Sequence, residues 1–536
     1  MVMRNTSGLA RLARLASLRA QQQAQQQQQP AARAFSALPA AEAAAAADAR
    51  GKPAPPPVAS VDGKAMHPSL LNANLLKTQY AVRGELYLRA EQLKKEGAKL
   101  DFISTNVGNP HALGAAPLTF TRQVVALAAC PQLLADPRAR DLFPADAIAR
   151  AKVLVESFNG GVGAYQDSRG NPHVRREIAD FINARDGVRD ATPEHIFLTD
   201  GASPAVRLAL NALLRDERDC ILVPIPQYPL YSASIQLLGG TLLPYELDET
   251  KGWALSVASL EAGLARARAE GKCVRGLVFI NPGNPTGQCL SKDNLQALLR
   301  FAGDHHIVLM ADEVYQENVY QTERPFVSAR RALAELPAPY KDGVELLSFH
   351  TVSKGTGGEC GLRGGYVEMH NLHPGAVEEM YKVCSINLSP NSVGQIAMSC
   401  LVNPPKAGDP SHALWKQERE AELASLKRRA VMVADAFNGL EGVSCTAVEG
   451  AMYAFPRIRL PPKAMAAAKA AGKAPDVFYC LRLLEATGIS TVPGSGFGQA
   501  EGTFHLRTTI LPREAKMADF CQRFERFHKA FMAEFK

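Results

Sequence analysis

The sequence has no run of about 18 or more consecutive apolar residues, so we expect no transmembrane helix. Its ten cysteines include no CxxC pair, which argues against a zinc ribbon, a thioredoxin-like motif and a disulfide framework. Aromatic residues make up only 7% of the chain and charged residues 21%, as in ordinary globular proteins. At 536 residues, the chain is long enough for sizeable cores and for roughly two to four domains.

Acidic residues are missing from the first 41 positions, which contain five arginines. An arginine-rich, acid-free start with an apolar helical pattern is typical of an organelle transit peptide. We predict one at residues 1–35, directed to the mitochondrial matrix rather than to the chloroplast; a disordered Ala/Gln-rich tail is the alternative. Five of the seven net positive charges lie in this segment. The basic balance is therefore no indication of nucleic-acid binding.

Composition and hydrophobic patterning divide the rest of the chain. Residues 36–67 are rich in alanine and proline and are predicted to be a disordered linker. From 118 to 385, apolar runs alternate with helical patterns, which predicts a large α/β domain with a mostly parallel sheet and helices on both faces. The predicted strands are 220–225, 274–280, 306–312 and 344–350, and the helices between them include 205–216 and 295–305.

A smaller α+β domain is predicted from residues 386–536, with residues 68–117 as an N-terminal arm that forms part of it. Its expected elements are a long helix at 412–440, β-rich segments at 446–458 and 503–511, and a surface insertion at 461–475.

Five motifs follow predicted strands, the place where open α/β sheets bind ligands. They are Thr199–Pro204, Pro226–Pro229, Asn281–Gly287, Ala311–Tyr315 and Thr351–Gly355, the last with Arg363 nine residues after Lys354.

The first three motifs offer neutral binding groups. The small-residue turn at Thr199–Pro204 precedes a helix, whose free N–H groups suit a phosphate; an ordinary helix start capped by Ser203 is the alternative. Tyr228 could stack on a flat cofactor or simply pack in a Pro-rich turn. The third motif presents Asn284 as an amide donor.

The last two motifs offer charges. A carboxylate at the end of an apolar strand is costly unless it is paired, so Asp312 indicates a cationic partner such as a pyridinium ring, with Tyr315 close by. Lys354 is expected to be partly desolvated and nucleophilic near neutral pH, with hydroxyls and Arg363 nearby to hold a phosphate. Considered by itself, Lys354 could be an ordinary solvated lysine at the end of a strand. The five motifs together predict a pyridoxal-phosphate (PLP) site.

Several segments also resemble a known family. NPGNPTG (281–287), ADEVY (311–315) and SKGTGGECGLRGG (353–365) resemble the class I/II aminotransferases of the fold-type-I PLP enzymes. The spacing of Arg363, together with YAVRGE (80–85), GVGAYQDSRG (161–170) and VPGSGFGQAEGTFHLRTTILP (492–512), is similar to the alanine aminotransferases in particular. This likeness covers about residues 68–536. One departure is Thr356-Gly357, where such enzymes carry bulkier residues.

The resemblance implies PLP as the cofactor, a homodimer, and a role for each matching residue. Lys354 would form the imine link to PLP and move the substrate proton, Asp312 would keep the ring nitrogen protonated, and Tyr315 would act with them. The further cofactor-binding residues would be Ala202, Ser203, Tyr228, Asn284, Thr351, Ser353 and Arg363, with Tyr165 reaching the phosphate from the neighbouring subunit.

Substrate binding is implied for four residues. Arg507 would clamp the α-carboxylate, a planar anion that suits a bidentate guanidinium. Tyr80 and Gly84 match a segment that closes over the substrate, and Asn284 would assist. Arg83 is a candidate for the distal carboxylate of glutamate. No metal is expected.

The implied reaction is L-alanine plus 2-oxoglutarate giving pyruvate plus L-glutamate, with ping-pong kinetics. A glyoxylate aminotransferase using alanine or glutamate as donor is the nearest alternative. A non-catalytic PLP-fold regulator is a second one, but neither terminus has a basic helix-turn-helix pattern, and both Lys354 and Arg507 are present.

Overall fold

The computed structural model describes residues 60–80 and 84–536. The chain divides into two compact units, Met1–Leu71 and Asn72–Lys536. In the described part of the first unit, Val61 and Lys64 form an antiparallel bridge and the 3₁₀ helix η1 spans Pro68–Leu70. The predicted transit peptide, most of the predicted linker and Arg83 lie outside the described residues.

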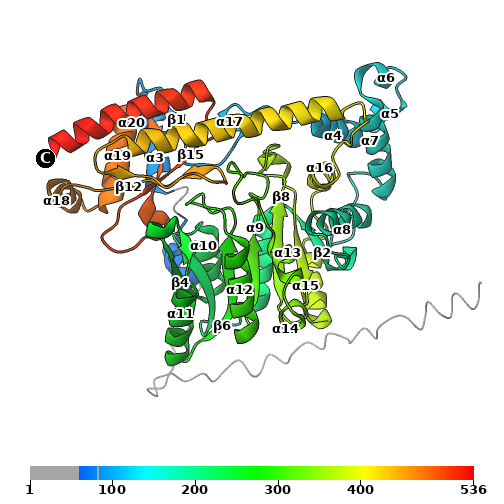
Figure 1. Ribbon diagram of the computed structural model, residues 1–536, viewed down its shortest axis with the longest axis horizontal. Coiled ribbons are helices and arrows are strands. Elements are labelled where there is room, and N and C mark those ends of the chain that lie inside the picture. Colours follow the sequence, from blue (N-terminus) through cyan, green and yellow to red (C-terminus); the bar gives the residue numbers. More distant parts are fainter. Residues whose placement is uncertain (1–59, 81–83) are drawn as a thin grey trace, which may run out of the picture. The chain divides into compact units, whose positions relative to one another are not determined.

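An eight-stranded sheet forms the centre of the second unit (Figure 1). In spatial order its strands are β2 (Ile196–Thr199), β9 (Gly365–His370), β8 (Leu346–Thr351), β7 (Val308–Asp312), β6 (Cys273–Ile280), β3 (Asp219–Ile225), β4 (Thr241–Asp248) and β5 (Ala254–Leu255). From β8 to β4 the strands pair in parallel, whereas β9 is antiparallel to both neighbours and β5 is antiparallel to β4. The predicted mostly parallel sheet is confirmed.

Helices cover both faces of this sheet, because successive side chains of a strand point to opposite faces and both sets are apolar here. In β3, Cys220 and Leu222 pack on one face, and Ile221 and Val223 pack on the other. The first face carries α11 (Val257–Ala269), α12 (Lys292–His305) and α13 (Ala329–Ala334), and the second carries α9 (Ala202–Leu213), α10 (Leu230–Leu238) and α15 (Pro374–Ile386).

A third helical layer packs beside β2. Its cluster of buried residues includes Val124, Leu154, Ile178 and Ile396. They belong to α4 (Thr119–Ala129), α7 (Ala145–Ser157), α8 (Pro172–Asp186) and α16 (Ser392–Val402). Although α16 follows residue 386, its side chains therefore pack with this layer of the α/β region.

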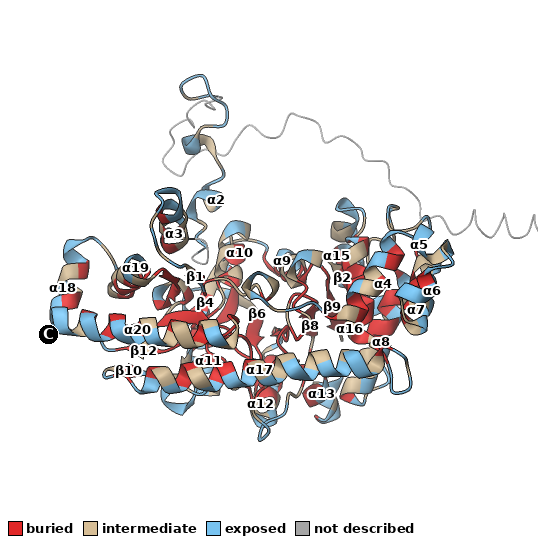
Figure 2. Cartoon of the chain, turned by 90° about the horizontal axis from the view of Figure 1, so that it is seen from above, coloured by how far each residue is buried: buried red, intermediate tan, exposed pale blue. Residues whose placement is uncertain are grey.

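Two long helices, α17 (His412–Asn438) and α20 (Glu514–Glu534), dominate the C-terminal part of the chain. In α17 the buried residues Leu426, Ala430, Val433 and Phe437 recur every three or four positions, which forms one apolar stripe. This stripe meets the phenylalanines of α20, with the Phe437 and Phe524 ring centres 4.9 Å apart. Figure 2 shows buried residues on both helices among exposed ones. The predicted helix at 412–440 is confirmed.

Short strands complete this part. β15 (Leu506–Thr509) lies between β11 (Tyr453–Ala454) and β14 (Val492–Pro493), antiparallel to both. β1 (Ile103–Ser104) pairs in parallel with β13 (Ile489–Ser490), and β10 (Val443–Ser444) pairs with β12 (Arg457–Ile458). The β1–β13 pairing joins residues 103–104 to residues 489–490. The small domain built from residues 68–117 and 386–536 stays a prediction.

The stretch 461–475, expected to be a surface insertion, contains helix α18 (Pro462–Ala470). Its residues are exposed or half-buried apart from Ala464 and Ala468, which are buried. Alanines spaced four residues apart form a narrow face that lets α18 pack closely on α19 (Pro475–Thr487).

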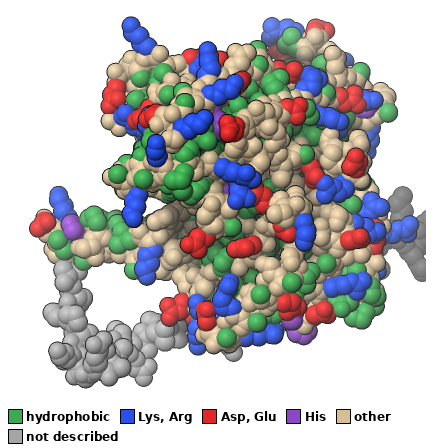
Figure 3. All heavy atoms as spheres, turned by 60° about the vertical axis from the view of Figure 1, so that its left-hand side comes forward, with side chains coloured by type: hydrophobic (Ala, Val, Ile, Leu, Met, Phe, Trp, Pro, Cys, Tyr) green, Lys and Arg blue, Asp and Glu red, His purple; other side chains and the backbone are tan. Residues whose placement is uncertain are grey.

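The surface mixes charges of both signs. On the face shown in Figure 3, Lys and Arg side chains are interspersed with Asp and Glu. Within residues 60–80 and 84–536, no helix combines the length and apolar character needed to cross a membrane.

Candidate active site

Five parallel strands end at one edge of the central sheet, and a predicted motif follows each of them. β2, β3, β6, β7 and β8 end at Thr199, Ile225, Ile280, Asp312 and Thr351. Side chains from these strand ends line a cavity of about 320 Å³. All of the predicted site residues line this cavity except Tyr165 and Gly84.

Asp312, the last residue of β7, is 5% exposed. Burial raises the pKa of its carboxyl group to about 6, although a hydrogen bond from Tyr231 opposes this rise. Tyr231 Oη donates to Asp312 Oδ2 at 2.7 Å. The other oxygen, Oδ1, is buried and has no partner in the described part of the chain. A buried carboxylate oxygen without a donor is costly, so Oδ1 fits the protonated ring nitrogen of a pyridinium.

Lys354 lies in the loop after β8. Its Nζ is 3.4 Å from the carbonyl oxygen of Gly108 and 5.6 Å from the centre of the Tyr315 ring. The loop is held by Gly355, which has φ 71° and donates its N–H to Asn318 Oδ1 at 2.9 Å. The amine therefore lines the same cavity as Asp312 from a restrained backbone, as a covalent link to a cofactor requires.

A chain of hydrogen bonds runs along the cavity wall from Arg507 to Tyr453. Arg507 Nη1 donates to Asn284 Oδ1 at 3.2 Å, and Asn284 Nδ2 donates to Tyr315 Oη at 3.4 Å. Tyr315 Oη in turn donates to Tyr453 Oη at 3.1 Å. The predicted substrate arginine and the predicted site residues Asn284 and Tyr315 thus form one connected group.

The turn before α9 has the features of a phosphate site. The helix begins at Ala202, and its N-cap is Gly201, with φ 93°. The expected alternative, a helix capped by Ser203, is wrong, because Ser203 lies inside the helix, which has no side-chain cap. Its hydroxyl and the first N–H groups of α9 are therefore available to an anion.

Arg363 completes this turn. Its Nη2 donates to the carbonyl oxygen of Asp200 at 2.7 Å, and its Nη1 lies 3.5 Å from Ser353 Oγ. Only a glycine fits at position 201, because a Cβ there would lie 2.5 Å from Arg363 Nη2. Thr351 Oγ1 donates to the Gly364 carbonyl at 2.7 Å and lies 3.1 Å from Ser353 Oγ. One guanidinium and three hydroxyls thus gather at the helix N-terminus, a donor set that suits a phosphate.

Two tyrosines meet at the mouth of the cavity. Tyr80 and Tyr228 share a hydrogen bond of 2.7 Å between their hydroxyls, and their rings meet edge to face. Gly84 precedes helix α3 (Glu85–Lys95) as its N-cap and does not line the cavity. Tyr165 is 76% exposed, in the loop between α7 and α8.

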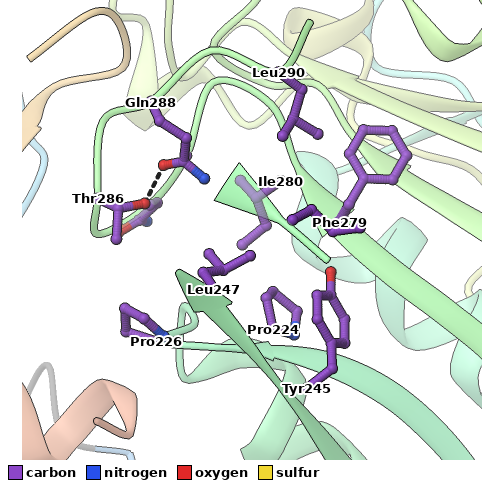
Figure 4. Close-up of a pocket in the computed structure, with 12 residues that line it drawn as sticks. Pro224, Pro226, Tyr245, Leu247, Phe279, Ile280, Thr286, Gln288 and Leu290 are labelled. Atoms are coloured by element: carbon purple, nitrogen blue, oxygen red, sulfur yellow. Dashed lines mark hydrogen bonds between the residues drawn. The ribbon is translucent and has the colours of Figure 1, made fainter. Parts of the chain in front are cut away.

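A second, much smaller pocket lies behind the Asn284 turn (Figure 4). Its volume is about 10 Å³, and it shares Ile280 and Asn284 with the large cavity. The Thr286 hydroxyl donates to the Gln288 side-chain oxygen across this turn (Figure 4), and Gly283 N–H donates to the Gln288 carbonyl oxygen at 2.9 Å. The turn is therefore closed on itself and holds Asn284 at the cavity edge.

Four residues of the site received no role from the sequence: Gly108, Tyr231, Cys360 and Tyr453. Cys360 lies within the motif 353–365 and Tyr453 within the predicted β-rich segment 446–458, but no pattern showed that their side chains face the cavity. Tyr231 is the second residue of α10 and comes just after the Pro226–Pro229 motif, but no sequence pattern gave its side chain a role.

The described part of the chain holds no cluster of three or more His, Cys, Asp or Glu side chains suited to a metal ion. The site combines a lysine, a buried carboxylate and a turn suited to an anion in one cavity. Together with the fold, these groups define a PLP-dependent enzyme.

Comparison with known proteins gives the family. Residues 138–524 match the family model "Aminotransferase class I and II", so the chain belongs to the class I and II aminotransferases. It is a transaminase, and its cofactor is PLP.

Two relatives and one solved structure illustrate the degree of similarity. The chain is 59% identical over 472 residues to "Glutamate--glyoxylate aminotransferase 1" of Arabidopsis thaliana, covering 88% of this chain and 98% of the relative. It is 49% identical over 475 residues to "Probable alanine aminotransferase, mitochondrial" of Dictyostelium discoideum, covering 86% and 89%. The solved alanine aminotransferase from Pyrococcus furiosus superposes with a TM-score of 0.68 at 26% identity, covering 86% of this chain and all of that structure.

We predict that Tyr231→Phe weakens PLP binding by roughly tenfold or more, because a hydrogen bond to a charged group contributes about 1.5–3 kcal/mol. Without the Tyr231 donor, the pKa of Asp312 rises further above its ordinary value, and less of the carboxylate is ionised near neutral pH. As the pH is lowered, the affinity of the variant for PLP should therefore begin to fall at a higher pH than the affinity of the wild type. Titration of apoenzyme with PLP between about pH 5 and about pH 8 measures this.

Tyr245→Phe is the matched control. Tyr245 is also a buried tyrosine, but its hydroxyl donates to the Val278 carbonyl at 2.7 Å, away from Asp312. Its loss should lower thermal stability and leave PLP affinity unchanged. Equal losses of affinity in the two variants would show that Tyr231 acts only through general stability.

Proposed function

We propose that this chain transfers the amino group of L-alanine to 2-oxoglutarate, giving pyruvate and L-glutamate in two half-reactions. The observation that carries this proposal is the joint presence of Lys354, Asp312 and Arg507 on one cavity. The relative named as a probable alanine aminotransferase supports alanine as the donor.

Arg507 is the proposed clamp for the substrate α-carboxylate. It is 1% exposed, and its Nη2 donates to the Asn106 carbonyl at 2.6 Å. Its Nε is buried without a hydrogen-bond partner in the described part of the chain. A guanidinium that is fixed at two positions and has a free N–H suits a carboxylate, and the clamp places the α-carbon for reaction.

Lys354 is the proposed proton carrier. When bound, PLP supplies a protonated pyridine ring that accepts the electron pair left on the substrate α-carbon. Lys354 Nζ would take the proton from the substrate α-carbon, which leaves that electron pair, and would carry the proton within the site. Asp312 would keep the ring nitrogen protonated, and Asn284 and Tyr315 would lie beside the ring 3-oxygen, with Asn284 Nδ2 as the hydrogen-bond donor. Ala202, Ser203, Thr351, Ser353 and Arg363 hold the phosphate.

A second candidate reaction uses glyoxylate as the amino acceptor, with alanine or glutamate as donor. It is favoured by the 59% identity to a relative named as a glutamate–glyoxylate aminotransferase. Both reactions need the same lysine, carboxylate and clamp.

A homodimer is proposed with Tyr165 at the subunit interface. Tyr165, Ile386 and Leu388 are exposed apolar side chains, and Ser168 Oγ donates to the Leu388 carbonyl at 2.6 Å, which holds their two segments together. Exposed apolar groups that gather in this way are typical of an interface. Sedimentation of the purified enzyme as a monomer would contradict it.

The mitochondrial matrix is the proposed location, with residues 1–35 as the transit peptide. The name of the Dictyostelium relative supports this location. A fusion of residues 1–35 to a fluorescent protein should enter mitochondria, and a fusion that stayed outside would contradict the proposal.

We expect L-alanine, added without an acceptor, to convert the yellow enzyme to its colourless amino form, and 2-oxoglutarate to restore the colour. This outcome follows because each half-reaction needs only one substrate. Absorption spectra recorded after each addition measure it. Failure of alanine to change the spectrum would contradict the proposed donor.

Lys354→Ala is the control for this experiment. The variant keeps the phosphate site, so it should still bind PLP, but without the covalent link and without turnover. A wild-type spectrum in this variant would remove Lys354 from its proposed role.

The acceptor is decided by the ratio of kcat/KM for 2-oxoglutarate to kcat/KM for glyoxylate, measured with alanine as donor. We predict a ratio above one. A ratio below one would replace the first candidate by the second, because kcat/KM measures discrimination between competing substrates.

A further inference from the structure

Tyr453 is a buried residue of β11 that contacts both halves of the site. β11 pairs with β15, the strand that carries Arg507. Tyr453 is 3% exposed, and its side chain lines the cavity. No sequence pattern assigned it a role.

The ring of Tyr453 lies against the Arg507 guanidinium. The guanidinium carbon is 4.3 Å from the centre of the Tyr453 ring and 4.7 Å from that of Phe497, so the cation lies between two aromatic rings. A desolvated cation is attracted to the face of an aromatic ring. The ring therefore restrains the orientation of the clamp.

The hydroxyl of Tyr453 lies on the other side of the site, toward Tyr315 and Lys354. Tyr315 Oη donates to it at 3.1 Å, and the two rings meet edge to face. A Cβ at Gly108 would collide with this hydroxyl and would lie 3.3 Å from Lys354 Nζ. Glycine at position 108 thus lets the hydroxyl and the amine share one narrow space.

The charges around this hydroxyl favour its role as an acceptor. Burial raises the pKa of Tyr453, but Lys354 and Arg507 outweigh burial, and the net direction is below the ordinary tyrosine value. The ionisable groups that face the hydroxyl from the surrounding segments are Lys354, Arg507, Tyr315, Cys360 and Tyr228.

We propose that Tyr453 is a positioning residue with two separable functions: its ring orients the Arg507 clamp, and its hydroxyl holds Tyr315 beside Lys354. This inference rests on the proposed amino transfer. It assigns the ring to binding of the carboxylate and the hydroxyl to proton transfer.

Two variants separate the functions. Tyr453→Phe keeps the ring, so KM for L-alanine should stay within about twofold, while kcat falls by roughly tenfold and the pH profile of kcat/KM shifts. Tyr453→Leu removes the ring as well, so KM for alanine should also rise by roughly tenfold. A pH profile for Tyr453→Phe that matches the wild type would overturn the role of the hydroxyl.

Two measurements do not require turnover. Calorimetry with propionate, a carboxylate without an amino group, should give wild-type affinity in Tyr453→Phe and affinity lower by roughly tenfold in Tyr453→Leu. Ultraviolet titration of the wild type should show one tyrosine ionising below about pH 10, and this step should be absent in Tyr453→Phe. Equal propionate affinity in the two variants would overturn the role of the ring, and an unchanged titration would overturn the role of the hydroxyl.

Tyr479→Phe is the matched control, because Tyr479 is a buried tyrosine whose hydroxyl pairs with His528 Nδ1 at 2.9 Å, away from the cavity. It should lose stability and keep the wild-type pH profile. The same pH shift in this variant would overturn the inference. If the wild type fails to convert alanine, the proposed function fails, but propionate binding and the tyrosine titration still decide the roles of Tyr453.

Discussion

The site depends on one negative charge buried at the end of a parallel strand. Removal of Asp312 from water favours its protonated form, and the hydrogen bond from Tyr231 only partly opposes this effect. A cationic ring nitrogen at Oδ1 would complete the stabilisation of the carboxylate. Because β6, β7 and β8 are neighbours in the sheet, Asn284, Tyr315 and Lys354 follow strand ends on the same edge as this charge. The carboxylate therefore determines where the ring lies, and the neighbouring strands supply the groups around it.

Positive charge exceeds negative charge on the cavity wall. Lys354, Arg363 and Arg507 line the cavity, and Asp312 is the acidic residue among its lining groups in the described structure. Other nearby cations have carboxylate partners of their own: Arg122 pairs with Glu359 at 2.7 Å, and Arg419 lies 3.6 Å from Glu317. The excess of positive charge on the cavity wall suits a cofactor phosphate and a substrate carboxylate, two anions that enter from solution.

Much of the sheet and of the site was predictable, because apolar runs rich in β-branched residues identify the strands from the local sequence alone. Most of the site residues lie at the ends of these strands. Lys354, Asp312, Asn284 and Arg363 could be found as residues that follow such strands. Tyr231 and Tyr453 could not, since the direction of an aromatic side chain on a short helix or a two-residue strand is decided by packing between distant segments. The prediction that Ser203 caps the helix was wrong for a related reason: Gly201 adopts φ 93° beside Arg363, and the helix begins two residues earlier than the local pattern indicates.

One hydrogen-bond network in the cavity wall joins the proposed site of the substrate carboxylate to the proposed site of the cofactor ring. Arg507 on β15 bonds to Asn284 after β6, and Asn284 bonds to Tyr315 after β7, so groups that face the substrate carboxylate and groups that face the cofactor ring belong to one network. An anion at Arg507 stabilises the nearby cations, whereas it repels the carboxylate of Asp312 and so favours a cationic ring nitrogen beside it. Binding energies coupled in this way are reciprocal: a carboxylate that binds more tightly when the ring is present must strengthen ring binding by the same factor. If Arg507 is the substrate clamp, the three-stranded sheet that carries it would contribute to cofactor retention as well as to substrate binding.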